Sequence, residues 1–200
     1  MSNHSFVGES CDGHMGLMSS YRWKSDPRTV LFMLSRYKFI SKMFEAKGNV
    51  LEIGCGDAFG SRLVADVVDH MDCYDQDRLM IESAAPHPKI SYFPDRFTYG
   101  SYDGAFALDV VEHNTPEEMR ELLRVMKASA PIVIIGSPSK ESQAYASPLS
   151  AQNHINCMTG PELRQAMKRY FREVLLFSMS DEVVHTGFSP MSHYNIAIGT

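Results

Sequence analysis

The chain has 200 residues, a formal net charge of −5 and 44% hydrophobic residues, which is enough to bury a core in one domain without disulfides. Its nineteen lysines and arginines form no basic run, so we expect no nucleic-acid partner. No stretch reads as a secretory signal or reaches the length of a membrane span, so we expect no membrane insertion. Four cysteines without a C-x-x-C pair fit a reduced, cytoplasmic compartment.

The N-terminal residues 1–27 are polar and contain several glycines. Two interpretations stay open for them, a lid over a site or a flexible segment. Residues 28–200 are expected to form the core of a single domain. It begins with a helix over 29–46, in which apolar residues recur at roughly helical spacing and after which Gly48 is a plausible stop; these residues are Leu31, Leu34, Ile40 and Phe44.

Strands and helices alternate beyond that helix, a pattern typical of an α/β fold with parallel strands and helices on both faces. The expected strands cover residues 50–53, 70–74, 90–93, 104–108, 132–135, 174–177 and 194–198. The expected helices cover residues 61–68, 77–84, 116–128 and 161–170. The last two strands lack a helix between them, so they can pair antiparallel.

The most informative segment runs from Val50 to Ser61, an apolar strand that ends in an acid and turns through clustered glycines. Glycine allows a positive φ and a close approach of the backbone to a ligand, so the segment is typical of a cofactor-binding loop. A dinucleotide fingerprint needs a third glycine where Phe59 stands. Glu52, two residues before Gly54, would repel a pyrophosphate and suits an ammonium or sulfonium group.

An acidic residue also closes the next expected strand. Asp75 follows Gly56 by nineteen positions (75 − 56), and a carboxylate there can accept hydrogen bonds from both ribose hydroxyls of an adenosine ligand. The alternative role for Asp75 is a helix cap. Gln76 and Asp77 are further candidates for the same contact.

The pattern E-x-G-x-G followed by Asp75 resembles motif I and its acidic partner in class I S-adenosylmethionine-dependent methyltransferases. The resemblance covers about residues 50–200. It implies a Rossmann-like, doubly wound seven-stranded sheet with a reversed final strand, and S-adenosylmethionine as the cofactor. It places the cofactor against one set of residues in this first half of the sheet, namely Glu52, Gly54, Cys55, Gly56, Asp75 and Gln76.

The resemblance also assigns roles to the loops that follow the third and fourth strands. Asp95 would reach the adenine amino group while Arg96 or Phe97 packs on the ring; a solvated turn is the alternative. The segment Leu-Asp-Val-Val-Glu-His over 108–113 looks like the family's loop after the fourth strand. It would set Leu108 and Asp109 against the cofactor and His113 near the reacting methyl.

Two histidines are the candidates for catalysis. The segment 153–159 resembles a passage that borders the acceptor pocket in small-molecule members, so His154 is the preferred proton acceptor and His113 the second candidate. A purely structural histidine is the alternative at both positions. Asp109, Glu112 and His113 could together hold a divalent ion, as in some methyltransferases, but the prediction is that no metal is bound.

The resemblance therefore predicts transfer of a methyl group to an oxygen or nitrogen of a polar small molecule, such as a sugar or another small metabolite. The partner is then a small-molecule acceptor, and a homodimer is compatible with the sequence. One alternative is an NAD-dependent or nucleotide-sugar oxidoreductase. Another is a catalytically silent subunit that binds the cofactor.

Overall fold

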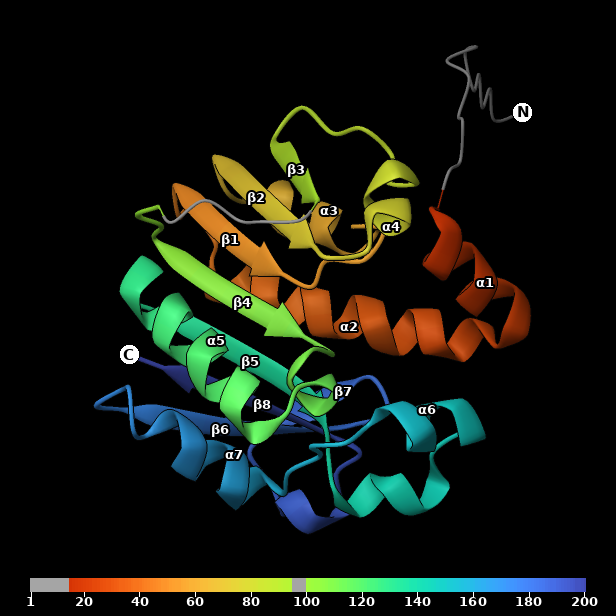
Figure 1. The fold of residues 1–200 in the computed structure, drawn as a ribbon, viewed down its shortest axis with the longest axis vertical. Helices are drawn as coiled ribbons and strands as arrows, with labels where there is room; N and C mark the ends of the chain where they lie inside the picture. Colours follow the sequence, from red (N-terminus) through yellow and green to blue (C-terminus); the bar gives the residue numbers. More distant parts are fainter. Residues whose placement is uncertain (1–14, 95–99) are drawn as a thin grey trace, which may run out of the picture.

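Eight strands form one sheet across residues 15–94 and 100–200, the part of the chain that the computed structural model describes (Figure 1). Their order is β3-β2-β1-β4-β5-β8-β6-β7. The bounds are β1 Asn49–Ile53, β2 His70–Asp75, β3 Ile90–Pro94, β4 Gly104–Leu108, β5 Val133–Pro138, β6 Val174–Ser180, β7 Val183–His185 and β8 Tyr194–Gly199.

The first five strands pair in parallel, and β8 runs antiparallel to both β5 and β6. The predicted mostly parallel α/β sheet and its reversed final strand are thus confirmed. The predicted number of seven strands is too low, because β7 pairs with β6 as an additional antiparallel strand. With three residues, β7 is too short to show a periodic pattern in the sequence.

Seven α-helices and three short 3-10 helices accompany the sheet in the described residues. The α-helices are α1 Leu17–Ser25, α2 Pro27–Met43, α3 Ser61–Ala65, α4 Arg78–Glu82, α5 Pro116–Ser129, α6 Pro148–Asn153 and α7 Gly160–Met167. The 3-10 helices are η1 Val111–His113, η2 Glu141–Tyr145 and η3 Ser189–Met191. None of the helices in this part of the chain is long and apolar enough to cross a membrane.

Local sequence signals explain where the main helices begin. Thr115 and Thr159 each form a capping box ahead of a proline, so α5 and α7 start where the sequence predicts. Asp26 caps α2 by accepting a hydrogen bond from the Arg28 amide. Of the apolar residues predicted to face the core, Ile40 and Phe44 are buried and Leu34 packs against the core. Leu31 is the exception, since it is 51% exposed while its neighbour Val30 is buried.

Alternate residues of each inner strand enter separate cores on the two faces of the sheet. Val50 of β1 belongs to the core beneath α2 and α3, together with Ile40 and Val64. Leu51 and Ile53 belong to the core beneath α5 and α7. This alternation follows from the two-residue period of a strand, and it also decides where Glu52 points.

Candidate active site

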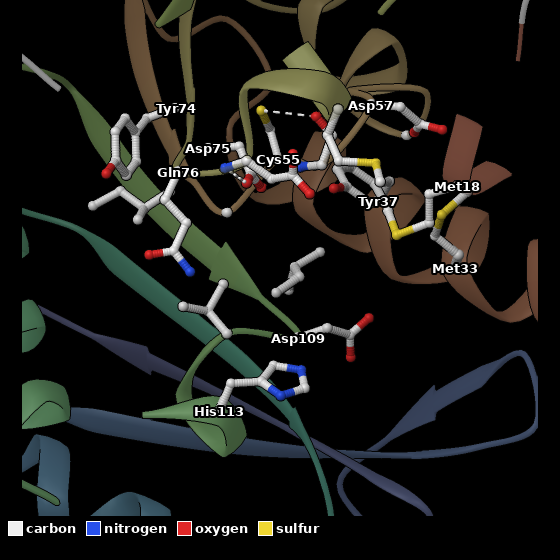
Figure 2. A pocket seen from close by; sticks show the side chains of 18 of the residues that line it. Met18, Met33, Tyr37, Cys55, Asp57, Tyr74, Asp75, Gln76, Asp109 and His113 are labelled. Atoms are coloured by element: carbon white, nitrogen blue, oxygen red, sulfur yellow. Dashed lines mark hydrogen bonds between the residues drawn. The ribbon is translucent and has the colours of Figure 1, made fainter. Parts of the chain in front are cut away.

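A cavity of about 840 Å³ opens at the carboxyl ends of β1, β2 and β4, with α1 and α2 along its border (Figure 2). Ligands bind at this edge in doubly wound sheets. The predicted site residues that line it are Gly54, Cys55, Gly56, Asp75, Gln76, Leu108, Asp109 and His113. The further candidate Asp77 and Asn153, the first residue of the expected acceptor segment, also line it. Lining residues that the sequence did not single out for this site include Met18, Arg22, Met33, Tyr37, Tyr74 and Asn114. The predictions for Asp95, Arg96 and Phe97 lie outside the described residues.

The glycine loop after β1 depends on glycine at two positions. Gly54 has a φ of 79° and Gly56 a φ of 57°, in the left-handed region that disfavours side chains. A Cβ on Gly54 would lie 2.2 Å from the Cγ2 atom of Val110. The loop therefore presents bare backbone to the cavity, as the sequence predicted for a cofactor-binding turn.

Asp75 stands at the end of β2 and closes the loop. Its Oδ2 atom accepts a hydrogen bond of 2.7 Å from the Gly56 amide, and its Oδ1 atom accepts one of 2.8 Å from the Asp77 amide. Asp77, not Asp75, is the residue that caps α4. Each carboxylate oxygen of Asp75 can accept a second hydrogen bond, so the side chain is oriented by the backbone and still open to a ligand in the cavity.

Glu52 lies behind the wall of the cavity and does not line it. Its carboxyl group is fully buried, where Tyr37 Oη donates a hydrogen bond of 2.6 Å to one oxygen and Cys73 Sγ lies 3.5 Å from the other. Burial raises the pKa of Glu52 to about 7. The side chain thus holds α2 and β2 against β1. The direct contact of Glu52 with the cofactor, predicted from the sequence, does not fit this buried position behind the cavity wall.

The buried carboxyl group makes a prediction about stability. The folded chain holds the proton of Glu52 more tightly than the unfolded chain does, because its pKa is raised from 4.5 to about 7. The stability that this proton gives to the fold is complete below pH 4.5 and is lost as the pH rises through about 7. The parent protein is expected to lose about 3 kcal/mol of stability between pH 4.5 and 8 through this group, and we expect Glu52→Gln to abolish that loss. Urea unfolding of both proteins across this range measures it, and parallel pH dependences would contradict it.

The helix α1 is bound to the glycine loop through one buried carboxylate. Asp57 is 2% exposed and accepts hydrogen bonds of 2.7 Å from the Ser19 amide and 2.9 Å from the Ser19 hydroxyl. Met18 and Arg22 of the same helix line the cavity. Residues 17–25 are therefore helical and lie at the cavity; whether they act as a lid stays a prediction.

Asp109 has an unusual backbone conformation and a charged partner from α2. It follows β4 with a φ of 56°, and its two carboxylate oxygens lie 2.9 and 2.6 Å from Arg36 Nη1. The Arg36 guanidinium also lies 3.7 Å from the centre of the Tyr194 ring, a favourable cation–π contact. Arg36 was not predicted from the sequence, because its partner Asp109 lies 73 positions away and no local pattern joins the two.

The two predicted catalytic histidines lie together at one end of the site. Their ring centres are 5.0 Å apart, and His113 lines the cavity next to Asn153. Burial, and then the proximity of His113, lower the pKa of His154. Glu112 lies under this pair, and burial followed by the charge of Asp109 raises its pKa to about 8.

The chain resembles known proteins in structure and not in sequence. The chain matches no protein-family model and no curated protein sequence. A methyltransferase from Archaeoglobus fulgidus described as SAM-dependent superposes with a TM-score of 0.68 at 16% identity, over 90% of this chain and 97% of that one. The methyltransferase domain of the bacterial protein CtHen1-C gives 0.68 at 16% identity, over 85% and 97%.

A third solved structure combines the same fold with the demethylated cofactor. The plantazolicin methyltransferase BpumL, solved with SAH, superposes with a TM-score of 0.66 at 14% identity, over 92% of this chain and 88% of that one. The chain has the class I methyltransferase fold. The cavity described above lies at the carboxyl edge of the parallel strands of this fold, and it is lined by Gly54, Gly56 and Asp75, which the resemblance assigned to the cofactor.

Proposed function

We propose that the protein transfers the methyl group of S-adenosylmethionine to an oxygen or nitrogen of a polar small molecule. One observation carries the proposal: the bare glycine turn and the oriented Asp75 carboxylate line the same cavity in a chain with the methyltransferase fold. BpumL, which shares this fold, was solved with S-adenosylhomocysteine.

The cavity offers complementary contacts along the length of this cofactor. We assign to Asp75 the two ribose hydroxyls and to the Gly54–Gly56 backbone the amino-acid end, because both line the cavity and the two glycines have positive φ angles. Met18, Met33 and Leu108 supply apolar surface, which suits the uncharged parts of the ligand. Glu52 fixes the orientation of one lining side chain, because Tyr37 lines the cavity and donates a hydrogen bond to that buried acid.

Transfer of a methyl group needs alignment and the removal of one proton. A lone pair on the acceptor attacks the methyl carbon, the carbon–sulfur bond breaks, and its electron pair stays on sulfur, which becomes a neutral thioether. Holding the acceptor in line at near-attack distance supplies several kcal/mol of rate enhancement. We propose that the cluster of His154 and His113 handles the proton that the acceptor loses.

Several features favour a small acceptor. The chain carries a net charge of −5 without a basic run, and His113, one of the two clustered histidines, lines the cavity. A cytoplasmic location, the absence of a nucleic-acid partner and a homodimer stay predictions.

Calorimetry separates this function from its alternatives. We expect purified protein to bind S-adenosylmethionine and S-adenosylhomocysteine and to leave NAD unbound; binding of NAD alone would establish the oxidoreductase alternative. A metabolite screen for a mass gain of one methyl group then identifies the acceptor. Binding without turnover in any acceptor class would point to the silent cofactor-binding subunit.

A further inference from the structure

We propose that Glu112, His113 and His154 bind a divalent transition-metal cation, and that this ion holds the oxygen of the methyl acceptor. Each residue offers one ligand atom, and these atoms all lie within 4.8 Å of one another. Ligand atoms around one zinc ion are about 3–4 Å apart, so small rotations of the imidazole rings complete the set. The His113 side chain is 46% exposed and has room for such a rotation.

The hydrogen bonds of both rings leave the correct nitrogen free. His113 Nδ1 lies 3.1 Å from the Asn153 carbonyl, which can only accept, so Nδ1 carries the proton and Nε2 carries the lone pair. His154 Nδ1 lies 3.0 Å from Gln143 Oε1. The Gln143 amide is itself oriented, because its nitrogen donates to the Ser139 carbonyl. Such outer partners are typical of histidines that bind metals.

The third ligand is a buried acid with an unused oxygen. Glu112 has a side chain that is 1% exposed, and its Oε1 atom has no hydrogen-bond partner in the described residues. That atom lies 4.0 Å from His113 Nε2. An unpaired buried oxygen is costly, and a cation between it and the imidazoles would remove the cost. Its other oxygen accepts a hydrogen bond of 3.2 Å from the Ser137 hydroxyl.

The backbone joins the two segments that carry the ligands. The Glu112 carbonyl accepts hydrogen bonds of 2.8 Å from the Ile155 amide and 3.0 Å from the Asn156 amide. The segment around His154 is therefore fixed directly against η1, which carries the other two ligands. The fold brings the two histidines together across 41 residues of sequence (154 − 113). This proposal differs from the sequence-based expectation that no metal is bound.

The ligand set indicates the class of metal and of acceptor. Two imidazoles and one carboxylate suit zinc, manganese, iron, cobalt or nickel better than calcium, which prefers an all-oxygen shell. Three protein ligands leave positions open for other oxygen ligands, as in catalytic metal sites. Resting on the proposed function, the inference narrows the acceptor to a molecule that presents a hydroxyl oxygen to the ion.

The bound ion defines the proton step. A hydroxyl coordinated to a divalent cation has a lowered pKa, so its proton leaves to solvent, and the resulting oxygen attacks the sulfonium methyl carbon. The carbon–sulfur electron pair stays on sulfur. With the ion bound, His113 and His154 act as its ligands, so the ion takes over the removal of the proton that the proposed function assigns to the two rings.

Binding of cobalt(II) to tag-free protein tests the site without any activity assay. We expect one equivalent to bind with visible d–d absorption bands, and Glu112→Gln and His154→Gln to weaken the affinity at least about tenfold. His70→Gln is the matched control, because His70 Nε2 also lies beside a carboxylate, 3.3 Å from Asp72 Oδ1. It should bind cobalt as the parent does.

The outcomes separate this inference from the proposed function. Absence of stoichiometric cobalt binding by the parent, or equal affinity in the two ligand variants, overturns the metal site. His154→Gln decides the matter if circular dichroism shows that Glu112→Gln does not fold. S-adenosylmethionine is titrated separately by calorimetry without metal. Cofactor binding without cobalt binding rejects only the metal site, whereas cobalt binding without cofactor binding rejects the methyltransferase function.

Discussion

Replacement of Asp75 by asparagine is expected to weaken S-adenosylmethionine binding at least about tenfold, which corresponds to about 1.4 kcal/mol. The carboxylate is held by the Gly56 and Asp77 amides with its remaining lone pairs toward the cavity. Charged acceptors form roughly twice as strong hydrogen bonds as neutral ones, and an asparagine amide keeps only one accepting atom. Calorimetric titration with both the cofactor and its demethylated product measures the loss.

The control for this variant comes from the same strand. Asp72 accepts a hydrogen bond of 2.8 Å from the Tyr102 hydroxyl and does not line the cavity. Asp72→Asn should therefore bind the cofactor with the affinity of the parent protein. If Asp75→Asn binds the cofactor as tightly as Asp72→Asn does, the ribose role of Asp75 is wrong.

Replacement of His154 by alanine should lower turnover by about 10²- to 10⁴-fold and leave cofactor affinity nearly unchanged. The His154 ring does not itself line the cavity, but its centre lies 5.0 Å from that of His113, which does, so we expect its removal to affect the acceptor side and not the contacts of Asp75. Single-turnover rates and calorimetry on the same samples separate the two effects. The acceptor found in the metabolite screen is the substrate for this measurement.

A histidine outside the site serves as the comparison. His185 of β7 bonds to Ser180 and Gly187, so His185→Ala is expected to keep normal turnover. A His154→Ala protein with the turnover of the His185→Ala protein would exclude His154 from the reaction, whether as a base or as a ligand.

Much of the fold follows from local signals, and the parts that were missed lack such signals. The capping boxes at Thr115 and Thr159 give α5 and α7 directly. The short helices α1 and α6 have no comparable apolar stripe, and α1 is held instead by the contact of Ser19 with Asp57. A tertiary contact between residues 38 positions apart leaves no periodic trace in the sequence.

In the candidate site too, residues close in sequence could be predicted to lie together, whereas contacts between distant residues could not. The glycines and Asp75 lie on one loop and the next strand, so their convergence follows from parallel topology. Strand alternation from Val50 could also have placed Glu52 in the core, because both residues point to the α2 face. The resemblance placed His113 and His154 on the acceptor side, but the approach of Glu112 to His154 depends on the path of residues 139–155, which the sequence pattern did not predict.

Because Asp57 anchors α1 to the glycine loop, the rate of proteolysis in α1 should report how much of the protein has cofactor bound. Asp57 directly follows Gly56 in the loop and accepts hydrogen bonds from Ser19 of α1. A cofactor bound against that loop should therefore also reduce the local unfolding of α1. Arg22 and Lys24 in α1 are trypsin sites. Cleavage there should slow as the cofactor saturates the protein, which reads occupancy from a gel without knowledge of the acceptor.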